Sequence, residues 1–379
     1  MKIVADENIP LVTEVFGCLG KVQTYAGRSI TAAQVKGADA LLVRSVTSVN
    51  ESLLRGSNVK FVGTCTIGTD HIDQAYLQAQ GIGFSSSPGC NAYGVVDYVI
   101  SALVRLSMQQ DFDLSTRCVG VVGVGNVGSR LKARLEAMGI RCLCCDPLHD
   151  DQNIPGLVHL DELIAESDII SLHTPLTKNG GHPTFHLFNA ENLPKLKPGS
   201  IFINTSRGAV VDNRALTTLL SQRKDITAVM DVWEGEPDIS LPLLDHVALA
   251  TPHIAGYSLD GKINGTRMVY QALCRYFGFE ETVDVDGLAP AIEKLEAECD
   301  ESASILEQAY QLVLACYDVR RDDLSFRAAM VLDNNNRPAS FDALRKNYPE
   351  RRELGVTGVK TDGGNEELNA LLKALGFKV

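Results

Sequence analysis

The sequence has no run of 18 apolar residues, no block of basic residues and no internal repeat. The absence of a long apolar run excludes a transmembrane helix of ordinary length. The opening MKIVADENIP also lacks the basic segment and the apolar core of a secretory signal peptide. We therefore expect a cytoplasmic protein without a membrane partner.

Basic residues are outnumbered by acidic ones. Lys and Arg total 35 against 47 Asp and Glu, which gives a net charge of −12. An acidic chain without a basic block is not suited to nucleic acid as its main partner. A local cluster of Arg side chains and N–H groups is still able to bind a small anionic substrate.

Cysteine and histidine give little indication of disulfides or a metal. Most of the ten cysteines lie in apolar strand or helix patterns, as in RCLCCD at 141–146, which indicates free buried thiols in a reducing compartment. His182 and His186 have the spacing of helical metal ligands, but Pro183 lies between them. We predict a surface loop there and no metal site.

The length of 379 residues suits two or three domains. Short apolar segments alternate with helical ones over residues 1–90 and again over 118–253, a pattern typical of parallel sheets with right-handed crossovers. We predict an α/β fold with two doubly wound parallel-sheet domains, one flavodoxin-like and one Rossmann, followed by a small C-terminal α+β module. The predicted boundaries are 1–95 with 257–284, then 96–256, then 285–379.

Helical spacing of apolar residues predicts a long helix over 91–109 and further helices in the tail, at 295–318 and 366–375. A helix is also expected after residue 257, with Met268, Leu273 and Tyr276 on its apolar face. This helix would pack back on the first domain and make that domain discontinuous.

The segment CVGVVGVGNVG, at 118–128, reads as a buried strand that runs into a glycine-rich turn and then a helix. Gly123, Gly125 and Gly128 would permit the turn, the approach of a pyrophosphate and close packing of helix on strand. The helix would present its N-terminal N–H groups to the phosphates. Its predicted buried face comprises Val127, Leu131, Leu135 and Met138.

The next strand ends at Asp146, which is 21 residues after Gly125. An acidic side chain at this distance accepts hydrogen bonds from the adenosine ribose and repels a 2′-phosphate. The sequence therefore predicts NAD rather than NADP as the cofactor.

Three other predicted strands are each followed by a polar residue suited to substrate binding or to acid/base catalysis. Arg207 lies in NTSRGAVVD, Glu236 in DVWEGEP, and His253 in TPHIAG. An arginine binds a carboxylate through paired, charge-assisted hydrogen bonds. Oxidation of an alcohol needs a base for the hydroxyl proton, and a histidine oriented by a carboxylate is suited to that role. We predict that these three residues form a catalytic site at the carboxyl edge of the sheet.

The glycine turn with Asp146 and the three segments NTSRGAVVD, DVWEGEP and TPHIAG make four motifs. In this order they resemble those of the D-isomer-specific 2-hydroxyacid dehydrogenases, and the resemblance covers residues 1–280. The resemblance implies His253 as the acid/base, Glu236 rather than Glu234 as its partner, and Arg207 on the substrate carboxylate and C2 oxygen. The expected cofactor contacts are Gly123, Gly125, Asn126, Val127, Gly128, Asp146, Thr174, Ser206, Asp231 and Gly256.

Further segments resemble one branch of that family, which oxidises 4-phospho-D-erythronate at C2 in pyridoxal phosphate biosynthesis. These segments are VADENIP, VRSVTSVN, GTCTIGTDHID and the tail sequence SFDALRKNYPERRE. The resemblance implies a phosphorylated hydroxy acid as substrate, Ser45, Thr66 and Tyr257 as its contacts, and a tail that serves for homodimerisation. Arg44 after the strand ALLV is an expected phosphate ligand.

Other interpretations stay open at this point. The same motifs also suit a dehydrogenase for another 2-hydroxy acid such as 3-phosphoglycerate, and an NAD-sensing binding protein of the corepressor kind. The polar residues at 44–47 are also typical of a surface loop that contacts only solvent and binds no phosphate. The tail cations Arg345, Lys346, Arg351 and Arg352 suit a solvated basic face better than the site of a partner subunit.

Overall fold

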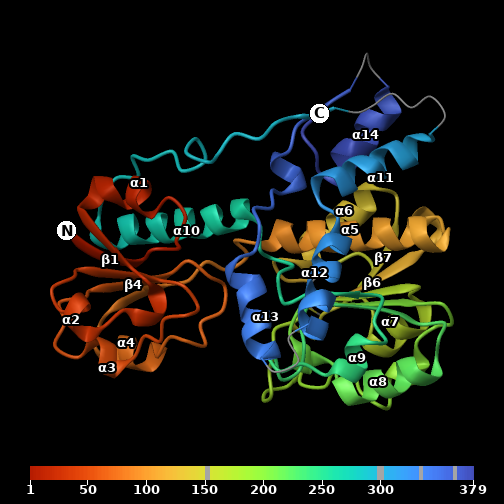
Figure 1. Cartoon of the computed structure of the whole chain (residues 1–379), viewed down its shortest axis with the longest axis horizontal. Helices are drawn as coiled ribbons and strands as arrows, with labels where there is room; N and C mark the ends of the chain where they lie inside the picture. Colours follow the sequence, from red (N-terminus) through yellow and green to blue (C-terminus); the bar gives the residue numbers. More distant parts are fainter. Residues whose placement is uncertain (150–153, 297–302, 333–335, 362–364) are drawn as a thin grey trace. The chain divides into compact units, whose positions relative to one another are not determined.

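The computed structural model describes residues 1–149, 154–296, 303–332, 336–361 and 365–379 (Figure 1). The chain divides into two compact units, each with its own sheet. The first unit comprises Met1–Asn91 and Ser258–Ala291, and the second comprises Ala92–Tyr257 and Ile292–Val379.

The first unit contains a parallel five-stranded sheet of order β2-β1-β3-β4-β5. This is the strand order of flavodoxin-like folds. The predicted doubly wound sheet is therefore confirmed. The strands are β1 (Lys2–Asp6), β2 (Lys21–Tyr25), β3 (Ala40–Val43), β4 (Phe61–Thr64) and β5 (Gly83–Ser85), and the helices are α1 (Val12–Phe16), α2 (Ala32–Val35), α3 (Glu51–Leu54), α4 (Gln74–Ala79) and α10 (Leu259–Phe277).

Helix α10 returns the chain to the first unit and packs on β4 and β5 (Figure 1). Leu273 is fully buried, as predicted, but Tyr276 is 46% exposed. The Tyr276 ring lies beside Phe61, and a side chain at Gly83 would collide with it. Tyr276 therefore lies on the packing face as predicted, but it covers the sheet with only one side of its ring and leaves the other in water.

The second unit contains a parallel six-stranded sheet of order β11-β10-β9-β8-β6-β7. A single parallel bridge pairs Leu157 with Cys144 beyond β7. Together with β7, β6, β8, β9 and β10 it gives the 3-2-1-4-5-6 order of dinucleotide-binding sheets, and β11 adds a seventh position at the far edge. The predicted Rossmann fold is thus confirmed. The strands are β6 (Cys118–Val122), β7 (Arg141–Cys145), β8 (Ile169–Leu172), β9 (Ile201–Asn204), β10 (Thr227–Met230) and β11 (Leu249–Ala250), and the helices are α5 (Ala92–Gln110), α6 (Gly128–Ala137), α7 (Leu160–Glu166), α8 (Asn213–Gln222) and α9 (Leu241–Leu244).

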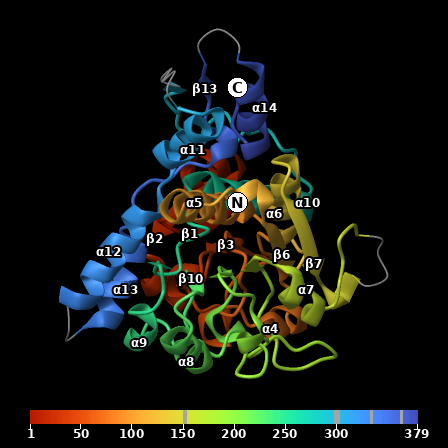
Figure 2. The ribbon, with the colours of Figure 1, turned by 90° about the vertical axis from the view of Figure 1, so that its right-hand side faces the viewer.

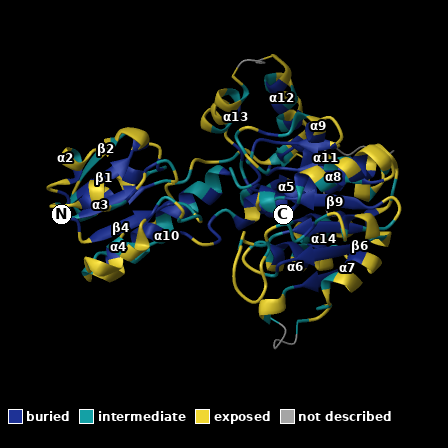
Figure 3. Cartoon of the chain, turned by 90° about the horizontal axis from the view of Figure 1, so that it is seen from below, coloured by how far each residue is buried: buried dark blue, intermediate teal, exposed yellow. Residues whose placement is uncertain are grey.

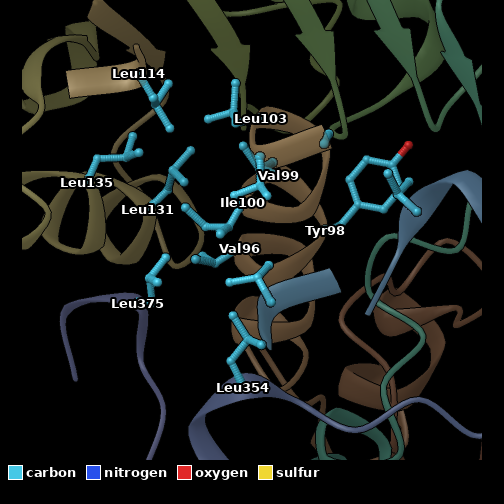
Figure 4. Packing of buried hydrophobic residues seen from close by; sticks show 14 of the residues in the cluster. Val96, Tyr98, Val99, Ile100, Leu103, Leu114, Leu131, Leu135, Leu354 and Leu375 are labelled. Atoms are coloured by element: carbon cyan, nitrogen blue, oxygen red, sulfur yellow. The ribbon is translucent and has the colours of Figure 1, made fainter. Parts of the chain in front are cut away.

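Helix α5 is the centre of the largest hydrophobic core (Figure 4). Residues all around it are buried, including Tyr98, Ile100 and Leu103. A helix that is apolar on every side must be enclosed by other elements. Here α6 contributes Leu131 and Leu135 to the same core, and the tail contributes Leu354 and Leu375.

The tail, Ile292–Val379, packs with the Rossmann sheet in one compact unit, and the predicted boundaries of the C-terminal module, 285–379, stay a prediction. Helices α12 and α13 lie side by side, as do α11 and α14 (Figure 2). The first two were missed by the sequence analysis. The predicted helix 295–318 begins as a strand, lies outside the described residues at 297–302, and is helical from Ile305. The tail elements are β12 (Leu295–Glu296), α11 (Ile305–Cys316), α12 (Val319–Leu332), α13 (Arg337–Lys346), β13 (Val359–Lys360) and α14 (Glu366–Leu375).

Arg351 ties the tail to the rest of its unit. The residue is 5% exposed. Its guanidinium stacks on Tyr317, at 4.4 Å from the ring centroid, and donates to the carbonyl oxygens of Ala255 and Gly94. Nearby, Asp97 pairs with Arg134 and accepts a hydrogen bond from the Leu354 N–H at 2.9 Å. The chain after α13 is thereby fastened to the loop that follows β11.

Replacing Arg351 by Met should destabilise the protein strongly. The change leaves two buried carbonyl groups without their donor and removes the cation that faces Asp97 and Asp322. Loss of one partner from such a buried polar network costs about 3–5 kcal/mol. Urea unfolding would measure the change, with Lys360→Met as the control. Lys360 is a surface cation, 65% exposed, so that variant should stay within about 1 kcal/mol of the wild type. Equal stabilities would contradict the bracing role.

Among the residues that the structure describes, no helix is both long and apolar enough to cross a bilayer. None of the nine cysteines within that part of the chain forms a disulfide, and seven of them are buried. No group of three or more metal-ligating side chains occurs there either. His186, which the sequence analysis placed in a surface loop, is part-buried and pairs with Glu234 at 2.8 Å.

Candidate functional site

The glycine-rich turn joins β6 to α6 with the geometry of a phosphate loop. Gly123 has φ of +90°, a backbone conformation that side chains rarely adopt. A Cβ on Gly128 would lie 1.9 Å from the carbonyl oxygen of Gly123, so only glycine permits α6 to begin this close to the strand. Val127, the N-cap of α6, is part-buried and Asn126 is exposed.

The surroundings of this turn fit a dinucleotide. A Cβ at Gly125 would meet nothing within 4 Å, so the backbone is open where a pyrophosphate would approach. Across the turn, the Thr174 hydroxyl oxygen is buried and has no hydrogen-bond partner among the described residues. A buried hydroxyl without a partner is costly unless a ligand completes it. Both observations agree with the predicted roles of Gly125 and Thr174.

Asp146 lies at the end of β7, beside the glycine turn. Its Oδ2 accepts a hydrogen bond from the Val124 N–H at 2.8 Å, and its Oδ1 accepts one from the Leu148 N–H at 3.1 Å. The side chain is 13% exposed. The carboxylate therefore fixes the turn and presents a negative charge at the edge where an adenosine ribose would lie.

The Asp146→Asn variant should lose part of its preference for NAD. The amide keeps an acceptor for the Val124 N–H but removes the charge that opposes a 2′-phosphate. We expect the ratio of kcat/KM for NAD to that for NADP to fall about tenfold or more. Asp161→Asn provides a control, because Asp161 is 82% exposed on α7. An unchanged ratio in Asp146→Asn would remove the residue from cofactor selection.

Asp231 shapes the loop after β11. The residue is 1% exposed. Its Oδ1 accepts hydrogen bonds from the Ile254 N–H and the Thr251 hydroxyl, at 2.8 and 2.7 Å, and its Oδ2 accepts one from the Ala255 N–H at 3.0 Å. Both oxygens thus hold the loop. The predicted contact of Asp231 with the cofactor stays a prediction.

His253 lies in this loop with φ of +57°, an uncommon conformation for a residue other than glycine. Its N–H donates to the Asp231 carbonyl oxygen at 2.7 Å, which helps to hold the strained backbone. The imidazole Nδ1 lies 2.5 Å from Oε1 of Glu236. The geometry therefore fixes the ring and leaves Nε2 as the nitrogen able to exchange a proton with a substrate.

Glu236 is held in turn by the backbone, because its Oε2 accepts a hydrogen bond from the Trp233 N–H at 3.1 Å. Burial raises the pKa of the Glu236 carboxyl, but the hydrogen bond and charge of His253 outweigh this effect, and the pKa lies below its ordinary value. The carboxylate is therefore ionised at neutral pH. Its contribution to stability is lost as the pH falls through this lowered pKa.

Arg207 follows β9 in a turn organised by Asn204. The Asn204 amide donates to the Arg207 carbonyl oxygen at 3.1 Å, and its Oδ1 accepts a hydrogen bond from the Ser206 N–H at 3.0 Å. The Ser206 side chain is 5% exposed. Arg207 itself is exposed, and its Nη1 donates to the Ser206 carbonyl oxygen at 2.7 Å. The guanidinium is thus available to an anionic ligand.

The predicted substrate residues of the first unit follow neighbouring strands. Arg44 and Ser45 come after β3, and Thr66 comes after β4. Arg44 is half-buried and Ser45 is exposed. The Thr66 hydroxyl lies 2.8 Å from that of Thr64, which lies 3.1 Å from His71 Nε2. These side chains therefore share one edge of the flavodoxin-like sheet.

Residues that the sequence analysis missed or treated as surface also build the site. Tail residue Tyr348 packs edge-on against Tyr257, which follows Gly256 in the catalytic loop, at a centroid distance of 5.9 Å.

Glu234 pairs with His186 and accepts a hydrogen bond from the Asn213 N–H at 3.3 Å. Burial lowers the pKa of His173, whose ring is hydrogen-bonded to Ser171, to about 3. No local sequence pattern marks these contacts.

Two families match this chain. Residues 103–255 match the D-isomer specific 2-hydroxyacid dehydrogenase, NAD binding domain. Residues 289–376 match a domain of unknown function, DUF3410.

Curated relatives match the chain over its whole length. Erythronate-4-phosphate dehydrogenase of Stutzerimonas stutzeri (strain A1501) is 50% identical over 379 residues, which is 100% of each chain. The erythronate-4-phosphate dehydrogenase of Azotobacter vinelandii is 50% identical over 376 residues, 99% of each chain.

Solved structures match a smaller part. The NAD+-bound 3-phosphoglycerate dehydrogenase of Entamoeba histolytica is 26% identical with a TM-score of 0.62, and the match covers 73% of this chain and 95% of that one. D-Lactate dehydrogenase of Aquifex aeolicus, in complex with NAD and lactic acid, is 25% identical with a TM-score of 0.56, and the match covers 77% and 100%. The unmatched quarter is about as long as the tail.

Proposed function

Because the chain belongs to the family of the erythronate-4-phosphate dehydrogenases, we propose that it oxidises 4-phospho-D-erythronate at C2. The product is 2-oxo-3-hydroxy-4-phosphobutanoate, and we place the reaction in pyridoxal 5′-phosphate biosynthesis. The chain is an NAD-dependent oxidoreductase with the NAD-binding domain of the D-isomer specific 2-hydroxyacid dehydrogenases.

The residues of the second unit divide the work of the reaction. Arg207 binds the substrate carboxylate and orients C2 through its planar pair of donors. His253 accepts the proton of the C2 hydroxyl at Nε2, and Glu236 stabilises the resulting imidazolium. Asp231 keeps the loop of His253 in position. NAD, when bound at the glycine turn, is the acceptor of the hydride from C2.

The observation that carries this proposal is the 2.5 Å contact between His253 and Glu236, in a loop at the carboxyl edge of the Rossmann sheet. Parallel α/β sheets bind their ligands at this edge. In the first unit, the cation of Arg44 and the hydroxyl groups of Ser45 and Thr66 are suited to the phosphorylated end of the substrate.

The deciding experiment compares NADH formation from 4-phosphoerythronate and from 3-phosphoglycerate under the same conditions. We expect a kcat/KM at least about tenfold higher for 4-phosphoerythronate. A preference for 3-phosphoglycerate would assign the chain another substrate of the same reaction. Binding of NAD without turnover of any 2-hydroxy acid would instead favour a sensing protein.

We further propose that the enzyme is a homodimer that pairs through its tail. Helix α12 carries exposed residues (Figure 3), and three of them are large and apolar. Leu324, Val331 and Leu332 are 60%, 70% and 84% exposed. Their spacing places them on one side of the helix. Such a stripe is typical of a surface that a second subunit covers.

Light scattering after size exclusion would test the dimer. The wild type should elute as a dimer, and Leu324→Asp should shift it towards the monomer, because a charge in the interface is costly to bury. Met108→Asp is the control, since Met108 is 43% exposed on α5, away from this stripe. A monomeric wild type would refute the proposed assembly.

A further inference from the structure

Arg345, near the end of α13, lies beside the catalytic loop of its own chain. Its guanidinium carbon is 5.5 Å from the centroid of the Tyr257 ring and 6.0 Å from that of Phe341. Tyr257 follows His253 by four residues, and the ring of Tyr348 in the tail also packs against it. Helix α13 therefore places a cation next to the end of the loop that holds the imidazole.

The charge of Arg345 also reaches Glu236. Burial raises the pKa of the Glu236 carboxyl, the interactions with His253 lower it, and the guanidinium of Arg345 adds to the lowering. The guanidinium of Arg345 thus acts on the acid/base pair through its charge, without an ion pair to Glu236 among the described residues. This position distinguishes it from Lys346, the next residue, which is exposed.

The donors of Arg345 are not used up by the protein. Its Nε–H is buried but makes no hydrogen bond among the described residues. A buried donor without a partner is unfavourable unless a ligand completes it. By contrast, Arg327 on the neighbouring helix uses Nε, Nη1 and Nη2 for Asp323 and two carbonyl oxygens, all at 2.8 Å. Arg327 is a structural arginine, whereas Arg345 keeps a donor that a ligand is able to satisfy.

The proposed substrate carries two anionic groups at opposite ends of a four-carbon chain. Arg207 is assigned to the carboxylate, which is adjacent to the reacting C2. The phosphate is two carbons further away and needs a second cation. A guanidinium binds a phosphate through two parallel N–H groups, and its Nε–H is suited to be one of them.

We infer that Arg345 is a substrate-binding residue that holds the phosphate of the substrate, so that the tail supplies part of the substrate specificity within its own chain. This inference rests on the proposed function. It also gives the tail a role that lactic acid, the ligand of the D-lactate dehydrogenase structure, does not require, since that ligand has no second anionic group.

The test uses the full-length protein and two substrates that differ only in the phosphate, 4-phosphoerythronate and D-erythronate. In Arg345→Gln, kcat/KM for 4-phosphoerythronate should fall about 10- to 100-fold, mainly through KM, while kcat/KM for D-erythronate stays within about twofold. Arg345→Lys keeps the positive charge but not the paired N–H donors of the guanidinium, so its loss of kcat/KM for 4-phosphoerythronate should be intermediate. The control Lys346→Gln should change neither value by more than about twofold.

A binding measurement makes the result independent of turnover. Calorimetric titration of the NADH-loaded protein with 4-phosphoerythronate should give a dissociation constant raised by a similar factor in Arg345→Gln. If Arg345 only braces Tyr257, both substrates lose activity equally, and that outcome overturns the inference while the proposed function stands. If the wild type fails to oxidise 4-phosphoerythronate at all, the proposed function fails and this inference fails with it.

Discussion

The variant His253→Asn should lower kcat by about two to four decades, because it removes the base that takes the C2 hydroxyl proton. Asparagine is chosen because it tolerates the left-handed backbone found at this position, where φ is +57°. The loss then reports on the imidazole and not on a distorted loop. Initial rates of NADH formation at saturating substrate would measure it.

Two controls make the His253 result specific. NADH binding, followed by fluorescence, should stay within about twofold of the wild type, because the glycine turn and Asp146 are untouched. His246→Asn changes an exposed histidine just before β11 and should leave kcat unaffected. Near-normal turnover in His253→Asn would remove the residue from the role of base and with it the proposed mechanism.

The variant Arg207→Ala should lower kcat/KM for 4-phosphoerythronate by about 30-fold to a few thousand-fold. This range corresponds to the 2–5 kcal/mol lost when one member of a desolvated, hydrogen-bonded charge pair is removed. The effect on folding should be small, because Arg207 is exposed and its guanidinium donates to the carbonyl oxygen of the preceding Ser206.

Steady-state kinetics with a thermal melt would separate these effects. Arg207→Lys should recover part of the lost kcat/KM, since it restores the charge without the paired donors. Arg214→Ala, at an exposed position on α8, provides the matched control. If Arg207→Ala melted at a much lower temperature than the wild type, the turn would be its main role and the carboxylate assignment would be lost.

Much of the fold follows from local patterns in the sequence. Strands buried on both faces read as continuous apolar runs, as in ALLV at 40–43 and IISL at 169–172. Since the carboxyl ends of parallel strands share one edge, the positions of Asp146, Arg207 and Asp231 could be anticipated before any coordinates. The order of the strands then places the glycine turn and the catalytic loop on the same sheet.

Helix α12 shows where such patterns fail. Its buried positions are Val319, Asp323, Phe326 and Met330, which have helical spacing. One of these positions is a carboxylate, which accepts a hydrogen bond from the Ala250 N–H at 2.8 Å. The exposed side carries leucines instead. Because apolar residues occur on both faces, a rule that assigns apolar residues to the core does not distinguish the buried face of this helix from the exposed one.

The contacts of the tail with the catalytic loop had no signature in the sequence. Arg351 donates to carbonyl oxygens that are 96 and 257 positions earlier in the chain. Such a contact depends on how distant elements pack, so it leaves no periodic pattern in the sequence. The cluster of arginines at 351–352 therefore suited a solvated surface equally well, and only the coordinates distinguish the buried Arg351 from it.

The dependence of the loop at 253–257 on Arg351 bears on the order of events during synthesis. A ribosome completes the Rossmann strands long before it reaches this arginine, yet the carbonyl group of Ala255 receives its donor only when the tail emerges. A nascent chain that stops before residue 351 would contain all strands of the Rossmann sheet, but its loop at 253–257 would lack the hydrogen bond from Arg351 to the Ala255 carbonyl oxygen. Competence for catalysis would thus depend on translation of the tail and not of the Rossmann strands alone.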